Sequence, residues 1–453
     1  MNKETSNFER INQGFKNSVS IKLIVISVLI LLLMIPNSMI ESIIWERKNL
    51  NDQANTEVSS QWAGSQQING PILVIPLLYE WEANGKLHSE TKNWYLLPEN
   101  LNIDGELSPK KLKRGIYDVV VYSSDIKVNG NFNISEDIDP YRLKEIQYDQ
   151  AFLSIGISDL RGIKNQISLK WMGENLGVKP GSRIKNQITT GITVELPKLE
   201  MDSIQNFEFS FDLELQGSRF ISFIPVGGIT NVNLSSSWPS PKFDGNFLPD
   251  NRVLNDSGFT ADYSILQLNR NFPQSWISEN QYSRLQEASF HIFLLVPLDN
   301  YSKAIRSSKY ALMTIGLTFL IFFLVEIINK RKIHPLQYTL VGMALCLFYV
   351  LLVSISEHST FNKAFAISAF GIISMIGLYS LSVFHSKKLS SLLIFTLIGI
   401  YGFLFVTLQL ADYALLMGGI GLSLILAATM YFTRKINWYK TNSNPEPNKD
   451  VEE

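Results

Sequence analysis

The stretch KYALMTIGLTFLIFFLVEIINKRKIHPLQYTLVGMALCLFYVLLVSISEH, Lys309–His358, decides the fold of this chain. Two apolar runs, Tyr310–Ile328 and Leu336–Ser356, flank the basic turn Lys330–Pro335. Each run has about 20 residues, which at ~1.5 Å per residue gives roughly 30 Å, the thickness of the hydrocarbon core of a bilayer. Because backbone at that depth must satisfy its own hydrogen bonds, we predict two helices joined as a transmembrane hairpin.

Further apolar runs lie on both sides of this stretch. Three follow it and contain no charged residue: Ala364–Phe384, Leu389–Leu410 and Tyr413–Phe432. Another, Ile21–Ile40, is either a cleaved signal peptide or an uncleaved anchor. This run is long for a signal peptide and no small-x-small site follows it, so the anchor is favoured. A helix is expected to continue from it towards Val58.

The middle of the chain has the texture of β structure. Phe207–Leu215 is the clearest strand, because Phe and Leu alternate there with polar residues. Further strands are predicted at Pro71–Tyr79, Gly115–Val128 and Ala288–Val296, and turns at dipeptides such as Asn129-Gly130. The predicted fold class is a membrane protein of α+β type, with one N-terminal transmembrane helix, a large, mostly β domain, and a C-terminal bundle of five transmembrane helices.

Basic residues mark one side of the membrane. They occur in Lys330–Lys332, at Lys387 and Lys388, and after the last apolar run, whereas the alternate connectors carry few of them. By the positive-inside rule both termini are cytoplasmic and the β domain lies outside. The predicted segments are a cytoplasmic N-terminus at 1–20, an anchor helix at 21–40, the outer domain at 41–309, the five-helix bundle at 310–432 and a cytoplasmic, disordered tail at 433–453.

Composition and motifs argue against several classes of protein. The formal net charge is -1, so nothing indicates a nucleic-acid partner. The single cysteine, Cys346, lies within an apolar run, which excludes a disulfide framework within one chain. The sequence contains no G-x-S-x-G, H-E-x-x-H, P-loop or G-x-G-x-x-G motif, and its five histidines are scattered. We therefore predict no catalytic residue, no metal and no cofactor.

Three polar residues at the ends of apolar runs are candidates for a functional role. Glu326 lies near the cytoplasmic end of its run, where it could snorkel towards Lys330 or Arg331, or face the bundle as part of a proton or ion path. Glu357 and His358 end the next run on the outer side. They are either interfacial polar residues or a pair that senses pH or contacts a ligand.

Two features of the outer domain allow a structural and a functional interpretation. Asp159 and Arg161, in the segment ISDLRGI, fit a local ion pair in a turn, and a binding site is the less favoured alternative. Trp238–Phe243 (WPSPKF) is a rigid aromatic segment, either a partner-binding knob or a packed corner.

Segments spread in order along most of the chain resemble the CreD family of bacterial inner-membrane, cell-envelope proteins. The segments are Trp62–Pro76 (WAGSQQINGPILVIP), Leu96–Glu99 (LLPE), Arg114–Tyr117 (RGIY), Ile155–Gly162 (IGISDLRG), Gly217-Ser218, Trp238-Pro239, Leu268–Arg270 (LNR), Pro273–Trp276 (PQSW), Val296–Tyr301 (VPLDNY), His334–Tyr338 (HPLQY) and Ser356–His358 (SEH). Their order, together with the predicted topology, makes the set specific.

The resemblance implies an inner-membrane protein with its β domain in the periplasm, linked to a two-component response that governs envelope integrity. It implies no catalytic residues. The expected function is that of a non-enzymatic protein whose partners are the lipid bilayer and an envelope component or partner protein bound by the β domain. The alternative is a transporter or lipid-handling protein that works through the C-terminal bundle, since one helix would suffice as an anchor.

Overall fold

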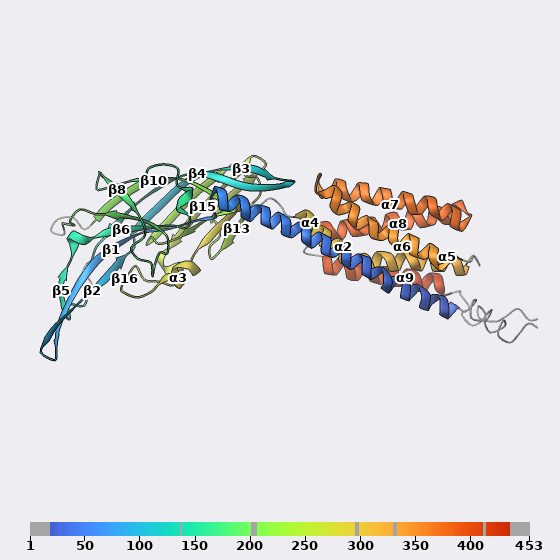
Figure 1. Cartoon of the computed structure of the whole chain (residues 1–453), viewed down its shortest axis with the longest axis horizontal. Helices are drawn as coiled ribbons and strands as arrows, with labels where there is room; N and C mark the ends of the chain where they lie inside the picture. The colour runs from blue at the N-terminus through green and yellow to red at the C-terminus, as the bar shows by residue number, and fades with distance from the viewer. Residues whose placement is uncertain are drawn as a thin grey trace, which may run out of the picture. The chain divides into compact units, whose positions relative to one another are not determined.

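Helix α2, Val19–Trp62, is a continuous helix of 44 residues in the computed structural model. The structure describes residues 19–135, 138–200, 206–294, 299–328, 333–410 and 414–434. The chain forms two compact units: a helical unit, made of the chain before Asn51 and after Pro297, and a β unit, Asn51–Pro297. α2 contributes its N-terminal part to the helical unit and its last turns to the β unit (Figure 1). The predicted continuation of the N-terminal helix beyond Ile40 is confirmed.

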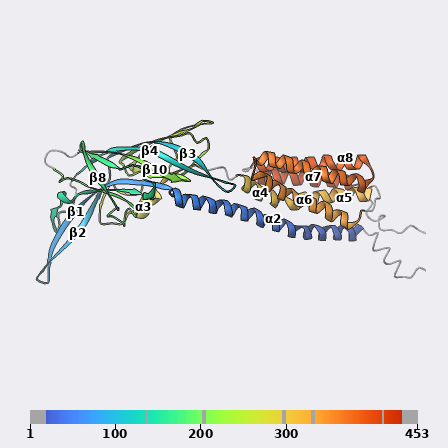
Figure 2. The ribbon, with the colours of Figure 1, turned by 45° about the horizontal axis from the view of Figure 1, so that its top comes forward.

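The helical unit contains the C-terminal helices, of which α5 to α9 run side by side (Figures 1 and 2). They are α4 (Asp299–Lys309), α5 (Ala311–Ile328), α6 (Pro335–Ser356), α7 (Phe361–Phe384), α8 (Lys387–Gln409) and α9 (Ala414–Thr433). The start of α6 follows from its sequence. Pro335 lies at the first helical position, where a backbone N–H would have no partner in the helix, and proline has no N–H. His334 caps this end by accepting a hydrogen bond from the backbone N–H of Leu336 over 3.2 Å.

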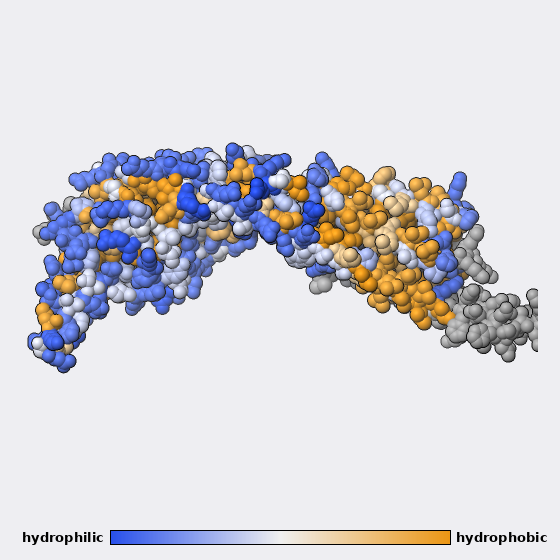
Figure 3. Space-filling model, in the orientation of Figure 1, coloured by the Kyte–Doolittle hydropathy of each residue, from blue (hydrophilic) through white to orange (hydrophobic). Residues whose placement is uncertain are grey.

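Four of the described helices are long and apolar enough to cross a membrane: Ile21–Trp62 of α2, and α6, α7 and α8. α4 and α5 pass the same test together, but they meet at a bend of 45°, so they form a broken span or a re-entrant segment. Apolar residues dominate the visible surface of the helical unit (Figure 3). The prediction of an α+β protein with several membrane-capable helices is confirmed.

One face of α2 packs into the core of the helical unit. Ile26, Leu33, Ile40 and Ile44 recur at helical spacing and are all buried among the other helices. Leu33 lies against Gly342 of α6, where an added Cβ would come within 2.2 Å of the leucine side chain. A small residue at this position therefore permits the close approach of α2 and α6.

The described residues of the β unit form seventeen strands in two sheets joined by one strand. The strands are β1 (Gln66–Ala83), β2 (Lys86–Leu96), β3 (Asn100–Arg114), β4 (Tyr117–Asn133), β5 (Leu143–Ile146), β6 (Phe152–Ile157), β7 (Ser168–Trp171), β8 (Glu174–Pro180), β9 (Gly191–Glu195), β10 (Asn206–Ser218), β11 (Phe220–Ile224), β12 (Ile229–Ser236), β13 (Pro241–Gly245), β14 (Asn251–Asn255), β15 (Gly258–Leu266), β16 (Ser275–Ile277) and β17 (Phe290–Leu294). A short helix, α3 (Tyr282–Glu287), precedes β17. The prediction of a mostly β domain is confirmed.

Sheet A is organised around β1, and sheet B around the long β3–β4 hairpin. In sheet A, β1 pairs in parallel with β11 and antiparallel with β2, β5 and β6, and the sheet continues through β17 to β13, through β2 to β16 and through β6 to β9. In sheet B the order is β14-β15-β12-β3-β4-β10-β7, with β12 and β3 parallel. β8 pairs with β7 and β9 and so joins the two sheets.

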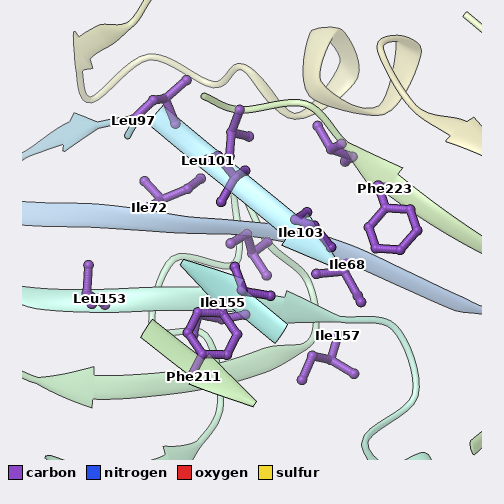
Figure 4. Close-up of a cluster of buried hydrophobic side chains, with 14 of the residues drawn as sticks. Ile68, Ile72, Leu97, Leu101, Ile103, Leu153, Ile155, Ile157, Phe211 and Phe223 are labelled. Atoms are coloured by element: carbon purple, nitrogen blue, oxygen red, sulfur yellow. The ribbon is translucent and has the colours of Figure 1, made fainter. Parts of the chain in front are cut away.

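One apolar core unites the two sheets. Figure 4 shows Ile68 and Ile72 of β1 beside Leu153 and Ile155 of β6, with Phe211 of β10 in the same cluster. β6 and most of β1 are buried on both faces. In a strand with only one face on the core, apolar and polar side chains alternate. β10 follows this rule along its length, since its Phe and Leu residues are buried and its Glu and Asp residues exposed.

The predicted strands lie in β1, β4, β10 and β17, with two corrections at glycines. Gly115, with φ of 64°, lies in the β3–β4 turn, so the strand begins at Tyr117. Asn129-Gly130, predicted as a turn, lies within β4. Gly130 is needed there for space, because an added Cβ would lie 2.1 Å from the carbonyl oxygen of Asn100. Trp238 is 7% exposed, so its ring is packed into the domain, whereas the next two residues, Pro239 and Ser240, are exposed.

Candidate functional site at the end of helix α2

Asp159 and Arg161 lie together against the C-terminal end of α2, within the β unit. Arg161 donates two hydrogen bonds to the Asp159 carboxylate, Nη2 to Oδ2 over 2.6 Å and Nε to Oδ1 over 2.9 Å. Asp159 Oδ2 also accepts the backbone N–H of Gly64 over 2.8 Å. Arg161 Nη1 donates to the carbonyl of Ser60, 2.6 Å away, in the last turn of α2. The ion pair predicted from the sequence is present, and it also caps a helix end.

Two further side chains fasten the chain where α2 passes into β1. Gln66 Nε2 donates to the carbonyls of Asp159 and Gln216, over 3.0 and 2.8 Å. Ser218 Oγ donates to the carbonyl of Ala63 over 2.8 Å, and both Gln66 and Ser218 are fully buried. We call Asp159, Arg161, Gln66 and Ser218 the helix-end clasp. Its members come from three separate segments, so the clasp holds the end of α2 to both sheets.

Two glycines allow these segments to approach one another closely. An added Cβ on Gly162 would lie 2.2 Å from Gln66 Nε2 and 2.3 Å from the carbonyl oxygen of Gln216. An added Cβ on Gly217 would lie 2.3 Å from the hydroxyl of Tyr122, which donates to the carbonyl of Phe220 over 3.0 Å. The clasp thus explains why glycine follows Asp159 and Arg161 and precedes Ser218.

The electrostatics of the clasp favour a fixed ion pair. The hydrogen bonds from Arg161 hold the pKa of Asp159 at about 2, with a further contribution from the N–H of Gly64, against the opposing effect of burial. The carboxylate therefore stays ionised at neutral pH and accepts hydrogen bonds only. Such a group is suited to holding a helix end and is not poised for acid–base chemistry.

Glu326 faces the interior of the helical unit and pairs with α2. Its side chain is 4% exposed and lies 2.7 Å from Lys22 Nζ. Tyr338 of α6 donates its hydroxyl to Glu326 Oε2 over 3.0 Å. The backbone N–H of Ile333 approaches the other carboxylate oxygen to 3.4 Å. Lys330 and Arg331, predicted as candidate partners, lie outside the described residues.

Glu357 also pairs with α2, whereas His358 does not join it. The Glu357 carboxylate lies 3.8 Å from Arg47 Nε and accepts a hydrogen bond from the Tyr301 hydroxyl over 3.2 Å. His358 is exposed, and its ring has no hydrogen bond or ion pair with the described residues. The two residues are therefore neighbours in sequence with different surroundings, and the structure shows no joint site for them within the described chain.

Four of the five candidate residues thus lie at three places that share one element, α2, whereas His358 lies at none of them. The helix-end clasp and the two glutamate pairs all act on α2, at Ser60, Lys22 and Arg47. Among the described residues no group of three or more His, Cys, Asp or Glu could hold a metal ion.

Sequence reasoning missed a row of amide side chains on the outer face of sheet B. Asn129, Asn102 and Asn231 lie opposite one another on β4, β3 and β12, and they are linked by side-chain hydrogen bonds of 3.2 and 3.0 Å. The sequence signal was Asn at alternate positions of each strand, as in Asn231 and Asn233. Such a pattern is visible only once the register between strands is known.

Comparison with known proteins gives one family. A family model described as Inner membrane protein CreD matches residues 18–439 of this chain. The Inner membrane protein CreD of Escherichia coli is 32% identical to it over 414 residues, which cover 90% of this chain and 91% of the relative. Among solved structures, an M1 zinc metallopeptidase from Deinococcus radiodurans, bound to a Tyr-Ser-Ala substrate, matches 43% of this chain and 42% of its own at 8% identity. The TM-score of this match is 0.20, too low to indicate a shared fold. On the agreement of the family model and the relative over nearly its whole length, the chain belongs to the CreD family of inner membrane proteins.

Proposed function

We propose that this chain is a non-enzymatic binding protein of the bacterial inner membrane that serves the integrity of the cell envelope. Its β unit lies in the periplasm and binds an envelope component or a partner protein. The observation that carries the proposal is that charged side chains fasten α2 in both units. Lys22 and Arg47 form ion pairs in one unit, and Arg161 donates a hydrogen bond to the Ser60 carbonyl in the other. A helix used only as a tether would need no such fastening, since an apolar span is stable in the membrane by itself.

The proposed topology has six spans, formed by α2, the α4–α5 pair, α6, α7, α8 and α9. An even number of spans places both termini on the same side of the membrane, and the basic residues Lys387 and Lys388 at the start of α8 favour the cytoplasm as that side. Lys22 and Arg47 support the crossing of α2. They are about 25 positions apart, which at ~1.5 Å per residue is roughly 37 Å, and the hydrocarbon core is roughly 30 Å thick. Each ion pair then lies near one membrane surface.

The competing function, transport or lipid handling by the bundle, rests on Glu326. A carboxylate in an ion path needs to face a polar cavity or a mobile partner. Glu326 instead lies against Lys22 and Tyr338, which occupy both of its oxygens. This arrangement favours a structural role for Glu326 and argues against an ion path through it.

In-cell photo-crosslinking tests the proposal. A photoreactive residue is placed at exposed positions of the β unit, Leu87 at the β1–β2 hairpin and Asn233 on sheet B, with Lys387 as the membrane-side control. The proposal expects a discrete adduct with a protein or an envelope component from at least one periplasmic position. Adducts no different from those at Lys387 would reject it and support the function of the bundle.

A further inference from the structure

The outer face of sheet B carries a hollow of about 450 Å³ lined almost entirely by amide, carboxylate and hydroxyl side chains. This volume lies within the range of about 300–1,000 Å³ that small-ligand sites occupy. Its floor is the amide row Asn129, Asn102 and Asn231, which Ser264 of β15 extends by donating to Asn231 Oδ1 over 3.1 Å. At its edge, Asp250 accepts the backbone N–H of Ser264 over 2.7 Å.

The amide row fixes its own side chains and still leaves hydrogen-bonding capacity free. Asn102 donates one N–H to Asn129 and accepts one from Asn231, over 3.2 and 3.0 Å. Each amide has two N–H donors and two oxygen lone pairs. One donor and one acceptor therefore remain on Asn102 and on Asn231 for a ligand. Because the row already orders these side chains, binding a ligand costs the protein little further side-chain entropy.

The charges of the hollow decide which ligands it can accept. Asp104, Asp250 and Asp262 contribute carboxylates, and none of the described lining residues is basic. Lys127 lies opposite Asp104 in the strand register but outside the hollow. Anionic ligands are therefore disfavoured, because they would meet carboxylates without a cation inside the hollow. The carboxylates also do not converge into a group that could hold a metal ion among the described residues.

A small apolar surface borders the amide row. Ile229 and Leu266 lie opposite each other on β12 and β15, two residues along each strand from Asn231 and Ser264, so they share the outer face. They are 42% and 45% exposed. A ligand with hydroxyl groups at its rim and an apolar ring face would satisfy both surfaces, since a hydroxyl donates one hydrogen bond and accepts others.

We infer that the hollow binds a neutral, polyhydroxylated ligand of the kind that a glycan chain presents, held by Asn102, Asn231 and the neighbouring carboxylates. The inference rests on the proposed function, because it names the class of envelope component that the β unit would bind. The same chemistry could come from a soluble oligosaccharide or from the insoluble glycan of the cell wall, and the test separates these sources.

The test is calorimetric titration of the full chain, solubilised in a detergent without a sugar headgroup, with neutral tetrasaccharides of glucose and of N-acetylglucosamine. A sulfated tetrasaccharide is the anionic control. Asn231→Ala removes two side-chain hydrogen bonds inside the hollow, one to Asn102 and one from Ser264. Asn131→Ala is the matched control. Asn131 also makes two side-chain hydrogen bonds, since it accepts one from Asn100 and donates one to Asn206, but it does not line the hollow. A parallel arm measures co-sedimentation with insoluble cell-wall glycan.

The inference expects saturable binding of a neutral probe or of the insoluble glycan, weakened about tenfold or more by Asn231→Ala and by less than about twofold by Asn131→Ala. Binding only in the tetrasaccharide arm indicates a soluble ligand, and binding only in the sedimentation arm indicates the wall. No binding in either arm, a preference for the sulfated probe, dependence on added calcium, or equal loss in both variants would overturn it. A discrete protein adduct in the crosslinking experiment, alongside such a failure, would leave the proposed function standing.

Discussion

Glu326 and Lys22 come from distant parts of the chain and form a pair in which the carboxylate is 4% exposed. Replacing one partner leaves the other charge without compensation, which is costly in a medium of low dielectric constant. We predict that Glu326→Gln and Lys22→Met each lower the apparent Tm of the detergent-solubilised protein. The free energy of unfolding should fall less in the double variant than the sum of the losses in the two single variants. The difference, the coupling energy, should be about 1–3 kcal/mol.

The measurement is thermal unfolding followed by tryptophan fluorescence for the four members of this cycle. Lys387→Met serves as the control for loss of a lysine, because Lys387 is exposed. Strict additivity of the two single changes would show that the pair contributes nothing to stability.

The clasp makes a prediction about pH at the same scale. Hydrogen bonds from Arg161 hold the pKa of Asp159 at about 2, below the value of ~3.9 for an aspartate in an unfolded chain. A lower pKa in the folded state stabilises the fold at pH values above the unfolded pKa. That contribution is lost as pH falls towards the folded pKa. We expect Asp159→Asn to be less stable than the parent protein at pH 7, and the difference to shrink between about pH 5 and 2.

Urea unfolding of the full chain across this pH range checks the prediction through the difference in midpoint between the two proteins. Asp244→Asn is the control, because Asp244 pairs with Lys242 at an exposed position and should change the midpoint little. A difference between Asp159→Asn and the parent that is the same at pH 7 and pH 2 would contradict the role assigned to the ionised clasp.

At the scale of elements, glycines govern how closely the strands and α2 approach. We predict that Gly217→Ala destabilises the β unit by about 1–3 kcal/mol, because its Cβ would overlap the Tyr122 hydroxyl. Gly177 of β8 is the matched control, since an added Cβ there meets nothing within 4 Å and its φ is not positive. Gly177→Ala should be neutral or slightly stabilising, by up to about 1 kcal/mol. Equal unfolding midpoints for the two variants in urea would refute the claim that close packing against Tyr122 requires glycine at position 217.

The same elements show what a sequence can disclose. The membrane-capable helices and the strand Phe207–Leu215 were predictable, because a helix that is apolar throughout leaves a long apolar run and a strand buried on one face leaves an alternating pattern. β14, Asn251–Asn255, was not predicted, since all five of its residues are exposed and leave no such pattern. The partner of Glu326 was also missed, because Lys22 is 304 positions away and only packing brings it near. The amide row was not predicted for a related reason, since strand register is a property of the folded sheet.

At the scale of the whole molecule, the position of each unit relative to the membrane is open to a direct test. The native Cys346 is 2% exposed and is first replaced by alanine. Leu87→Cys then reports on the β unit, Asn362→Cys on the start of α7 and Lys387→Cys on the start of α8, and all three positions are exposed. Lys388 remains in the last variant, so a basic residue is retained at that end of α8.

The topology proposed above predicts that a membrane-impermeant maleimide, applied to cells with a permeabilised outer membrane, labels positions 87 and 362. Position 387 should react only after the inner membrane is broken. The reason is electrostatic, because the lysine pair at the start of α8 favours the cytoplasmic side while the connector before α7 carries no comparable basic cluster. Labelling at position 387 before the inner membrane is broken would show that the bundle has the opposite orientation to the one proposed. Protection at 87 until lysis would place the β unit in the cytoplasm, and no periplasmic ligand could then reach the amide row.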